Sequence, residues 1–119
     1  MDESRKKELV EAGVNVDAAL DRFMGNEKLL TRFLLKFSQD KNYDRLVSAM
    51  EKEDYNDAFE AAHALKGLSG NLSMDDLYEA SGRATECLRH EKYEEAKECM
   101  PKLKEEYERV SKVVDTLEG

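Results

Sequence analysis

The chain has 119 residues, of which 39% are charged, and it carries a formal net charge of -8 with a pI near 4.9. This acidic excess argues against nucleic acid or an anionic membrane surface as a partner, because both require a basic face. No apolar run approaches the roughly 18 residues needed to span a bilayer, and residues 1–13 lack the apolar core of a signal peptide. The length fits one domain. We therefore expect a soluble, cytoplasmic protein with a single domain over residues 1–119.

The composition favours helices over sheets, because the chain has a single proline, no tryptophan and no isoleucine. A short first helix is predicted over residues 4–12, with Gly13 as its C-terminal stop. Asn15 is a suitable N-cap for a second helix over residues 16–24, which ends at Gly25.

A third helix is predicted over residues 27–37, with Asn26 as its cap. The polar stretch over residues 38–42 predicts a bend or interruption, followed by a further helix that ends near Lys52. The apolar positions of these two helices are Leu29, Leu30, Phe33, Leu34 and Phe37, then Leu46, Val47 and Met50.

The next helix carries His63, and Asp54 can cap it. Ser73 and Asp76 resemble a capping box for a sixth helix, which should run to roughly His90. The inward positions predicted for these two helices are Ala58, Ala62, Leu65, Ser69 and Leu72, then Leu77, Ala80, Ala84 and Cys87 or Leu88.

The last helix has the most regular apolar spacing, which continues in phase through Pro101, so we expect a kink there rather than a break. The short joints make neighbouring helices antiparallel. The sequence therefore predicts an all-α fold, an up-and-down antiparallel four-helix bundle with one or two short extra N-terminal helices, in which residues 1–12 are an integral part or a peripheral extension. The apolar positions of the last helix are Tyr93, Ala96, Met100, Leu103, Tyr107, Val110, Val114 and Leu117.

The direction of His63 follows from the helical turn of about 100° per residue. With Ala62 at zero, the apolar stripe falls between roughly -20° and -80°, whereas His63 falls at roughly +100°. Gly67 and Gly70 share this outer face, at about +140° and about +80°. We interpret both glycines as clearing the approach to His63, and Lys66, one turn on, as able to meet a negative charge on the imidazole.

Plainer interpretations compete with this one. Most surface histidines have no special role, and Gly70 can instead end the helix in a left-handed conformation. His90 lies near a helix C-terminus, where a cation complements the helix dipole. The two histidines lie on different predicted helices and Cys87 and Cys99 form no CxxC pair, so we expect no metal site.

The stretch AHALKGLSGNL over residues 62–72 resembles the signature of histidine-containing phosphotransfer (HPt) domains, the carrier modules of two-component phosphorelays. The resemblance extends over nearly the whole chain from about Gly13. Many family members have glycine where this chain has Ser73, and serine there still suits an N-cap. The positions that match the core of the signature are His63, Leu65, Lys66, Gly67 and Ser69.

This resemblance implies a phosphoryl carrier. His63 would accept a phosphoryl group from an aspartyl phosphate of one receiver domain and pass it to the aspartate of another, while Lys66 would stabilise the phosphate charge. The family's Mg²⁺ belongs to the receiver, so the chain itself needs no cofactor. Because no glycine-rich phosphate loop is present, we expect no ATP site and no autokinase activity, and therefore a carrier rather than an enzyme. The implied partners are response-regulator receiver domains and a hybrid sensor kinase, and we expect a monomer.

A receiver must cover His63 during transfer, so the surrounding surface should be apolar at its centre with a polar rim. Two alternatives compete with the carrier. One is a non-catalytic helical adaptor or interaction domain in which His63 is incidental. The other is the dimerisation and phosphoacceptor domain of a sensor kinase, which usually needs two chains. The candidate docking residues are Phe59, Gly67, Leu68, Gly70, Phe23 and Met24.

Overall fold

The structure is a computed structural model that describes residues 1–117, and within this range it contains helices and no strand. The all-α prediction is therefore confirmed. In chain order the helices are α1 (Glu3–Glu11), α2 (Val16–Arg22), α3 (Glu27–Phe37), α4 (Asn42–Glu51), α5 (Tyr55–Asn71), α6 (Asp75–Arg89) and α7 (Tyr93–Val114).

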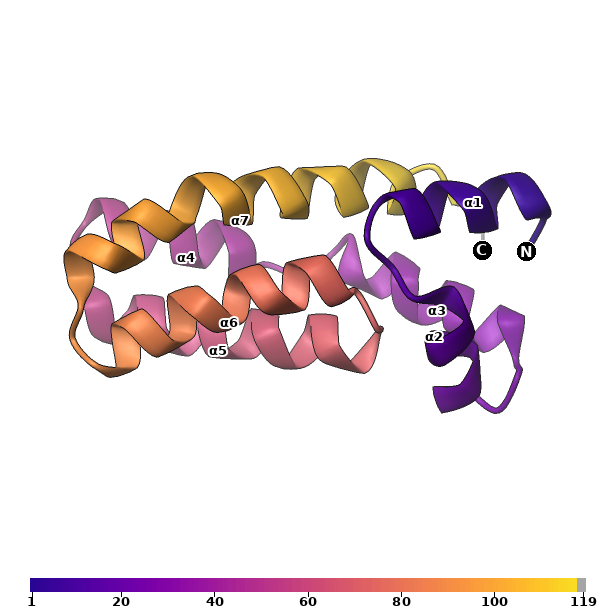
Figure 1. Cartoon of the computed structure of the whole chain (residues 1–119), viewed down its shortest axis with the longest axis horizontal. Helices are drawn as coiled ribbons and strands as arrows, with labels where there is room; N and C mark the ends of the chain where they lie inside the picture. Colours follow the sequence, from indigo (N-terminus) through magenta and orange to yellow (C-terminus); the bar gives the residue numbers. More distant parts are fainter. Residues whose placement is uncertain (118–119) are drawn as a thin grey trace.

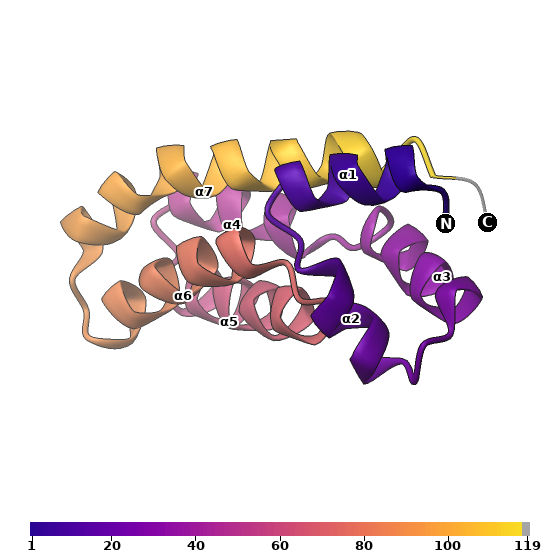
Figure 2. The same ribbon diagram turned by 45° about the vertical axis from the view of Figure 1, so that its right-hand side comes forward.

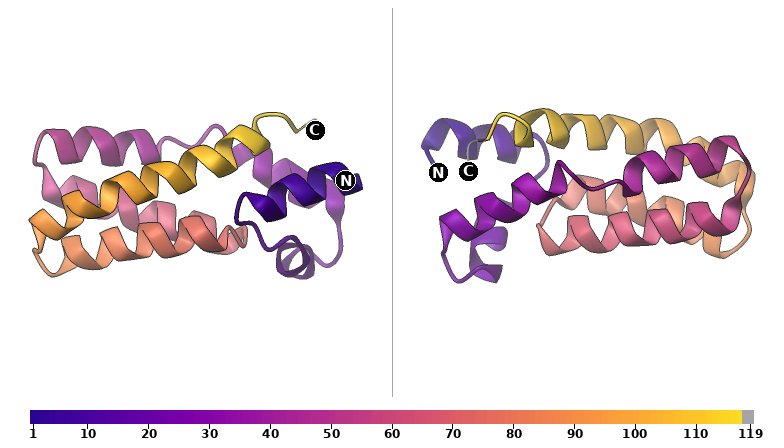
Figure 3. Two further views of the ribbon diagram at one scale, coloured as in Figure 1. Left: turned by 45° about the horizontal axis from the view of Figure 1, so that its top comes forward. Right: turned by 180° about the vertical axis from the view of Figure 1, so that it is seen from behind.

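The helices form an elongated molecule with principal extents of 42 × 22 × 20 Å (Figure 1). Helices α4 to α7 form an up-and-down bundle in which α5 packs against α4 and α6, and α6 packs against α7. Helix α7 extends beyond the other three, and α1 lies beside its C-terminal half (Figure 2). Helices α3 and α4 follow one another along the molecule, so that α2 and α3 occupy the end opposite the α4–α5 and α6–α7 joints (Figure 3).

Local side chains determine where most helices begin and end. The side-chain oxygens of Asn15, Asn26 and Asp54 accept hydrogen bonds from the backbone N–H three residues on, at 3.0, 3.0 and 3.2 Å. These bonds satisfy N–H groups that have no partner inside the first helical turn. Gly13 and Gly25, with φ of +93° and +76°, follow the ends of α1 and α2. Gly13, Asn15, Asn26 and Asp54 are confirmed as boundary residues, whereas α2 ends at Arg22 instead of continuing to Gly25, and Met24, with φ of +57°, is the first left-handed residue after it.

The joint between α5 and α6 differs from the prediction. Helix α5 continues through Gly70 to Asn71, so Gly70 does not end it. Ser73 is the left-handed residue, with φ of +54°, and Met74 is the N-cap of α6, without a side-chain hydrogen bond. The predicted capping box at Ser73 is therefore wrong. The reason is tertiary: the Ser73 carbonyl accepts a hydrogen bond from the N–H of Asn15 at 2.8 Å, which ties this joint to the segment before α2.

The core follows the predicted apolar positions except at Phe33, which is 37% exposed, and helix α7 runs unbroken through Pro101. One buried carboxylate interrupts this pattern: Glu106 is 2% exposed and pairs with Lys102 at 2.9 Å and with Arg109 at 3.1 Å. In helix α5 four of the five buried side chains are alanine or serine, which lets the helices on either side approach it closely. The buried residues of α5 are Ala58, Ala61, Ala62, Leu65 and Ser69.

Helix α1 is attached to the end of α7. Leu9 is fully buried in the core. A guanidinium nitrogen of Arg109 donates a hydrogen bond to the Glu11 carbonyl at 2.6 Å, and Arg5 donates one to the Thr116 hydroxyl at 2.9 Å. These contacts connect residues 1–12 with the C-terminal helix by both apolar burial and hydrogen bonds.

Candidate functional site

His63 lies in the middle of α5 and is exposed, whereas Ala61 and Ala62 just before it are fully buried. Because α4 and α6 cover the two flanks of α5, the imidazole projects from its remaining free face. The direction predicted from the helical period is thereby confirmed. His63 is reachable by a large partner without any movement of the bundle.

The two glycines near His63 have different surroundings. A Cβ built on Gly67 would meet no heavy atom within 4 Å, so the surface beside the histidine is open at this position. A Cβ built on Gly70 would lie 3.0 Å from two ring carbons of Tyr78. The interpretation that Gly70 clears the approach to His63 is therefore wrong. Its missing side chain makes room for an aromatic ring of α6.

Aromatic and cationic groups border the histidine on the side of α6. The ring centroids of His63 and Phe59 are 5.8 Å apart, with an interplanar angle of 43°. The guanidinium carbon of Arg89 lies 5.1 Å from the centroid of the Phe59 ring, on the other helix. Further along α5, the ammonium of Lys66 lies 5.6 Å from the centroid of the Tyr78 ring. Two positive charges thus lie on the flank of His63 that faces α6.

An ion-pair cluster borders the opposite flank, on the side of α4. The guanidinium of Arg45 binds the carboxylate of Asp57, and a second contact reaches Glu60 at 2.9 Å. The hydrogen bond from Arg45 lowers the pKa of the Asp57 carboxyl. The same bond raises the pKa of Arg45. Arg45 thus neutralises part of the negative charge on this flank of α5.

The sequence pattern around His63 does not by itself point to Tyr78 or Arg89. Phe59 of α5 contacts Arg89 of α6. Seven residues later on α5, Lys66 contacts α6 at Gly82, which lies seven residues before Arg89. A further step of four residues on both helices brings together Gly70 and Tyr78. The pairs are thus symmetric about residue 74, the N-cap of α6. Each of these residues of α5 lies opposite the residue of α6 that is equally distant from residue 74. With the joint placed correctly, this rule would have identified Tyr78 and Arg89.

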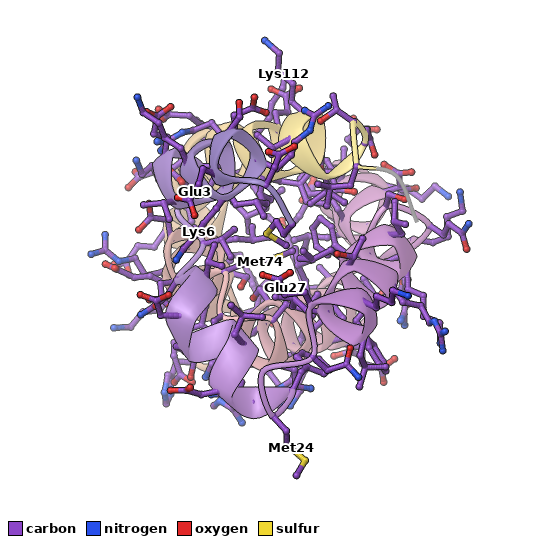
Figure 4. All side chains as sticks on the ribbon, turned by 90° about the vertical axis from the view of Figure 1, so that its right-hand side faces the viewer. Glu3, Lys6, Met24, Glu27, Met74 and Lys112 are labelled. Carbon is purple, nitrogen blue, oxygen red and sulfur yellow. The ribbon has the colours of Figure 1, made fainter. Side chains whose placement is uncertain are left out.

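The predicted docking residues fall into two groups. Phe59, Gly67, Leu68 and Gly70 lie with His63 on α5, where Phe59 and Leu68 are half-buried and Gly67 is exposed. Phe23 and Met24 lie instead in the turn between α2 and α3, beyond the C-terminal end of α5 (Figure 1). Met24 is 94% exposed and projects away from the helices, whereas Met74 lies in the interior (Figure 4). The Phe23 ring packs at 5.1 Å on that of Phe33.

Within residues 1–117, no group of three or more His, Cys, Asp or Glu side chains is arranged to hold a metal ion. In the same range no helix combines the length and the apolar character required to cross a bilayer.

A comparison with protein families adds one finding to this geometry. A family model described as "Hpt domain" matches residues 29–113, which is more than half of the chain and includes the whole of α5. Helices α1 and α2 precede the matched range. No curated protein and no solved structure matches the chain.

Proposed function

This chain belongs to the Hpt domain family, and from that premise we propose that His63 is its phosphoacceptor. Hpt domains are phosphocarriers of two-component systems that interact with the receiver domains of response regulators, and they are not enzymes with a catalytic site of their own. The finer proposal is that His63 takes the phosphoryl group from the aspartyl phosphate of one receiver domain and delivers it to the aspartate of another. The observation that carries this proposal is the exposed imidazole beside the open surface at Gly67.

The transfer suits a neutral imidazole. One ring nitrogen attacks the phosphorus, an N–P bond forms, the P–O bond to the aspartate breaks and the carboxylate is released, while the second ring nitrogen keeps its proton. Phosphoryl transfer depends mainly on in-line positioning and on neutralisation of charge. His63 supplies the nucleophile on a rigid helix, and Lys66, three residues on, supplies positive charge for the phosphoryl oxygens. The Mg²⁺ of the family belongs to the receiver domain.

The docking surface proposed for the receiver has its centre on α5. Phe59 and Leu68 supply apolar area, and Gly67 allows the backbone of the partner to approach. We include the exposed Met24 as a contact at the periphery, together with its neighbour Phe23, whose ring packs on that of Phe33. We propose that the chain acts as a monomer, because helices α4 to α7 complete the bundle within one chain. We also propose that it has no ATP site, because its sequence has no glycine-rich phosphate loop.

The second histidine of the chain provides a matched control. His90 is exposed and follows α6, where its Nε2 lies 3.4 Å from Glu86. The wild type, His63→Gln and His90→Gln are each tested in two separate reactions. One contains phosphoramidate, a small donor that phosphorylates imidazole, and the other contains ³²P-labelled receiver domains. With the receiver domains as donors, we expect acid-labile, base-stable phosphate on the wild type and on His90→Gln, and none on His63→Gln. Equal labelling of His63→Gln and wild type would show that His63 is incidental and would leave a helical adaptor.

A further inference from the structure

Lys66 lies across the boundary between α5 and α6 rather than extending into solvent. It is half-buried, and its ammonium lies 5.6 Å from the centroid of the Tyr78 ring. A Cβ built on Gly82 would lie 3.6 Å and 3.7 Å from Cε and Cδ of Lys66, which is ordinary van der Waals contact. Any side chain larger than alanine at Gly82 would therefore compete with the Lys66 methylenes for this space. Lys66 therefore occupies a defined site on α6, formed by the Tyr78 ring and the backbone at Gly82, which we call the seat.

The Tyr78 ring is itself held in place. It packs directly on the backbone of α5 at Gly70, because a Cβ there would lie only 3.0 Å from two of its ring carbons. The ring remains 44% exposed. The two glycines thus make room for two contacting side chains: Gly70 leaves space for the Tyr78 ring, and Gly82 leaves space for the methylenes of Lys66.

In the seat, the Lys66 ammonium contacts an aromatic ring and not a carboxylate. Within residues 1–117 no ion pair involves Lys66, although the chain has 27 acidic residues. Four carboxylates line the same groove. Glu79 and Glu86 of α6 are engaged by Arg83 at 3.0 Å and by Arg89 at 3.2 Å, and neither Glu95 nor Glu98 of α7 forms an ion pair with Lys66. The face of an aromatic ring attracts a cation more weakly than a carboxylate does, and it leaves the charge free to change partner.

The seat also lies on the far side of Lys66 from the histidine. His63 is three residues before Lys66 on α5, whereas the Tyr78 ring packs at Gly70, four residues after it. The lysine therefore stands between two positions. One is the aromatic ring, and the other is the place where a phosphoryl group on His63 would carry its negative charge.

We propose that Tyr78 is a positioning residue for Lys66, which rests on its ring in the unphosphorylated protein and moves to the phosphoryl group when His63 is phosphorylated. This inference rests on the proposed function, since it needs phosphate on His63. The exchange is driven by charge, because an ammonium forms charge-assisted hydrogen bonds with phosphate oxygens that outweigh its attraction to a ring. The contact between Lys66 and the Tyr78 ring stabilises only the unphosphorylated state. Phosphorylation is therefore disfavoured by the free energy of this contact.

The first test is spectroscopic and needs no partner. Protons over a ring face resonate upfield, so the Lys66 ε-methylene signal of the ¹³C-lysine-labelled protein should be shifted upfield. The signal is assigned by its loss in Lys66→Met. The shift should persist in Tyr78→Phe, disappear in Tyr78→Leu, and also disappear in the wild type once phosphoramidate has phosphorylated it. An unshifted signal in the resting protein, or a shift that survives phosphorylation of His63, would overturn the proposal.

The second test measures the phosphorylation equilibrium at fixed phosphoramidate and ammonia. The N–P bond of phosphoramidate breaks, ammonia leaves, and the N–P bond to His63 forms. Tyr78→Leu should raise the ratio of phosphorylated to unphosphorylated chain by about two- to fivefold, because an exposed cation–π contact is lost from the resting state alone. Tyr78→Phe should match the wild type, and Tyr78→Leu should have no effect in a Lys66→Met background.

Tyr93→Leu is the matched control, since Tyr93 stacks on Tyr55 with ring centroids 3.9 Å apart and takes no part in the site. It should leave the ratio unchanged, and urea unfolding of each variant identifies any loss of folding. An equal effect of Tyr78→Leu with and without Lys66 overturns the proposal, because the ring would then act on the fold and not on the lysine. Absence of phosphate from His63 in every variant removes the proposed function and the exchange with it. An upfield Lys66 signal in the resting protein would still show the seat in that case.

Discussion

Gly67 and Gly70 are both glycines of α5 within seven residues of His63, yet a side chain would meet open space at the first and an aromatic ring at the second. Helix propensity disfavours glycine at both positions by about 1 kcal/mol relative to alanine. At Gly70 the packing of Tyr78 compensates for this loss within the bundle itself. At Gly67 nothing in the bundle does, and we propose that this glycine leaves space for a partner.

The substitution Gly67→Gln tests this explanation at the level of one residue. The added side chain would occupy the surface that a receiver domain covers, so we expect phosphotransfer from a labelled receiver to fall by about tenfold or more, which corresponds to about 1.4 kcal/mol. Labelling of His63 by phosphoramidate should be unchanged, because this donor is small. Both rates are measured by quench-flow with ³²P.

The free energy of unfolding of Gly67→Gln should rise by about 0.5 kcal/mol, since glutamine is the better helix former and its side chain meets no neighbour. Urea unfolding provides this control. If transfer from the receiver proceeds at the wild-type rate, the partner does not approach His63 over Gly67.

At the scale of helices, left-handed residues recur at the joints. Among residues 1–117 the non-glycine residues with positive φ are Met24, Glu53, Ser73 and Glu91, each in a joint that follows a helix. Gly13 serves the same role after α1. A left-handed conformation costs a residue with a Cβ about 1 kcal/mol or more, and a glycine pays no such steric cost. The glycine that many family members have at the position of Ser73 therefore has a physical reason.

We expect Ser73→Gly to raise the free energy of unfolding by about 0.5–1 kcal/mol, because relief of the left-handed strain exceeds the extra entropy that glycine gains in the unfolded chain. Urea unfolding followed by circular dichroism measures the change. The backbone hydrogen bond from Asn15 to the Ser73 carbonyl is retained in this variant. A lower stability would mean that the Ser73 side chain contributes more than its backbone conformation costs.

The pairing of α4 with α5 predicts a dependence on acidic pH. Arg45 lowers the pKa of Asp57 below its usual 3.8, so the folded state binds this proton less readily than the unfolded chain does. The pair therefore stabilises the fold fully above about pH 4, and this stabilisation is lost as the pH falls through the lowered pKa. Unfolding free energies between about pH 6 and about pH 3 should decline less steeply in Asp57→Asn than in the wild type.

The control for this prediction is Asp21→Asn, a substitution on α2 that should keep the wild-type pH dependence. Identical slopes for Asp57→Asn and the wild type would contradict the assignment. The prediction concerns stability alone, because the ion-pair cluster of Arg45 lies on the flank of α5 and not at the imidazole.

At the scale of the whole molecule, the net charge of -8 determines how a partner approaches. This acidic excess favours a receiver with basic residues at the rim of its docking surface, and attraction of this kind accelerates association. We expect the association rate with a receiver to fall as salt is raised from about 50 mM to about 500 mM, since the Debye length shortens about threefold over this range.

Stopped-flow fluorescence with a labelled receiver measures this rate, and a neutral solute of matched viscosity is the control. Dissociation should change less, because it depends on the apolar centre of the interface rather than on its charged rim. A rate that is independent of salt, or that increases with it, would indicate a partner without basic rim charges.

The sequence alone determined the helices, the outward direction of His63 and the family. The helices and the direction of His63 follow from local rules: capping by Asn15, Asn26 and Asp54 involves residues three apart, and the helical turn relates every residue to its own neighbours. The family follows from the resemblance of residues 62–72 to a known signature. The tertiary structure decided which residues of α6 face α5, and it thereby placed Tyr78 on Gly70 and Arg89 over Phe59. This register depends on the conformation of the joint between the helices, and a contact with the distant segment before α2 helps to hold that joint, so no helical period could have supplied it.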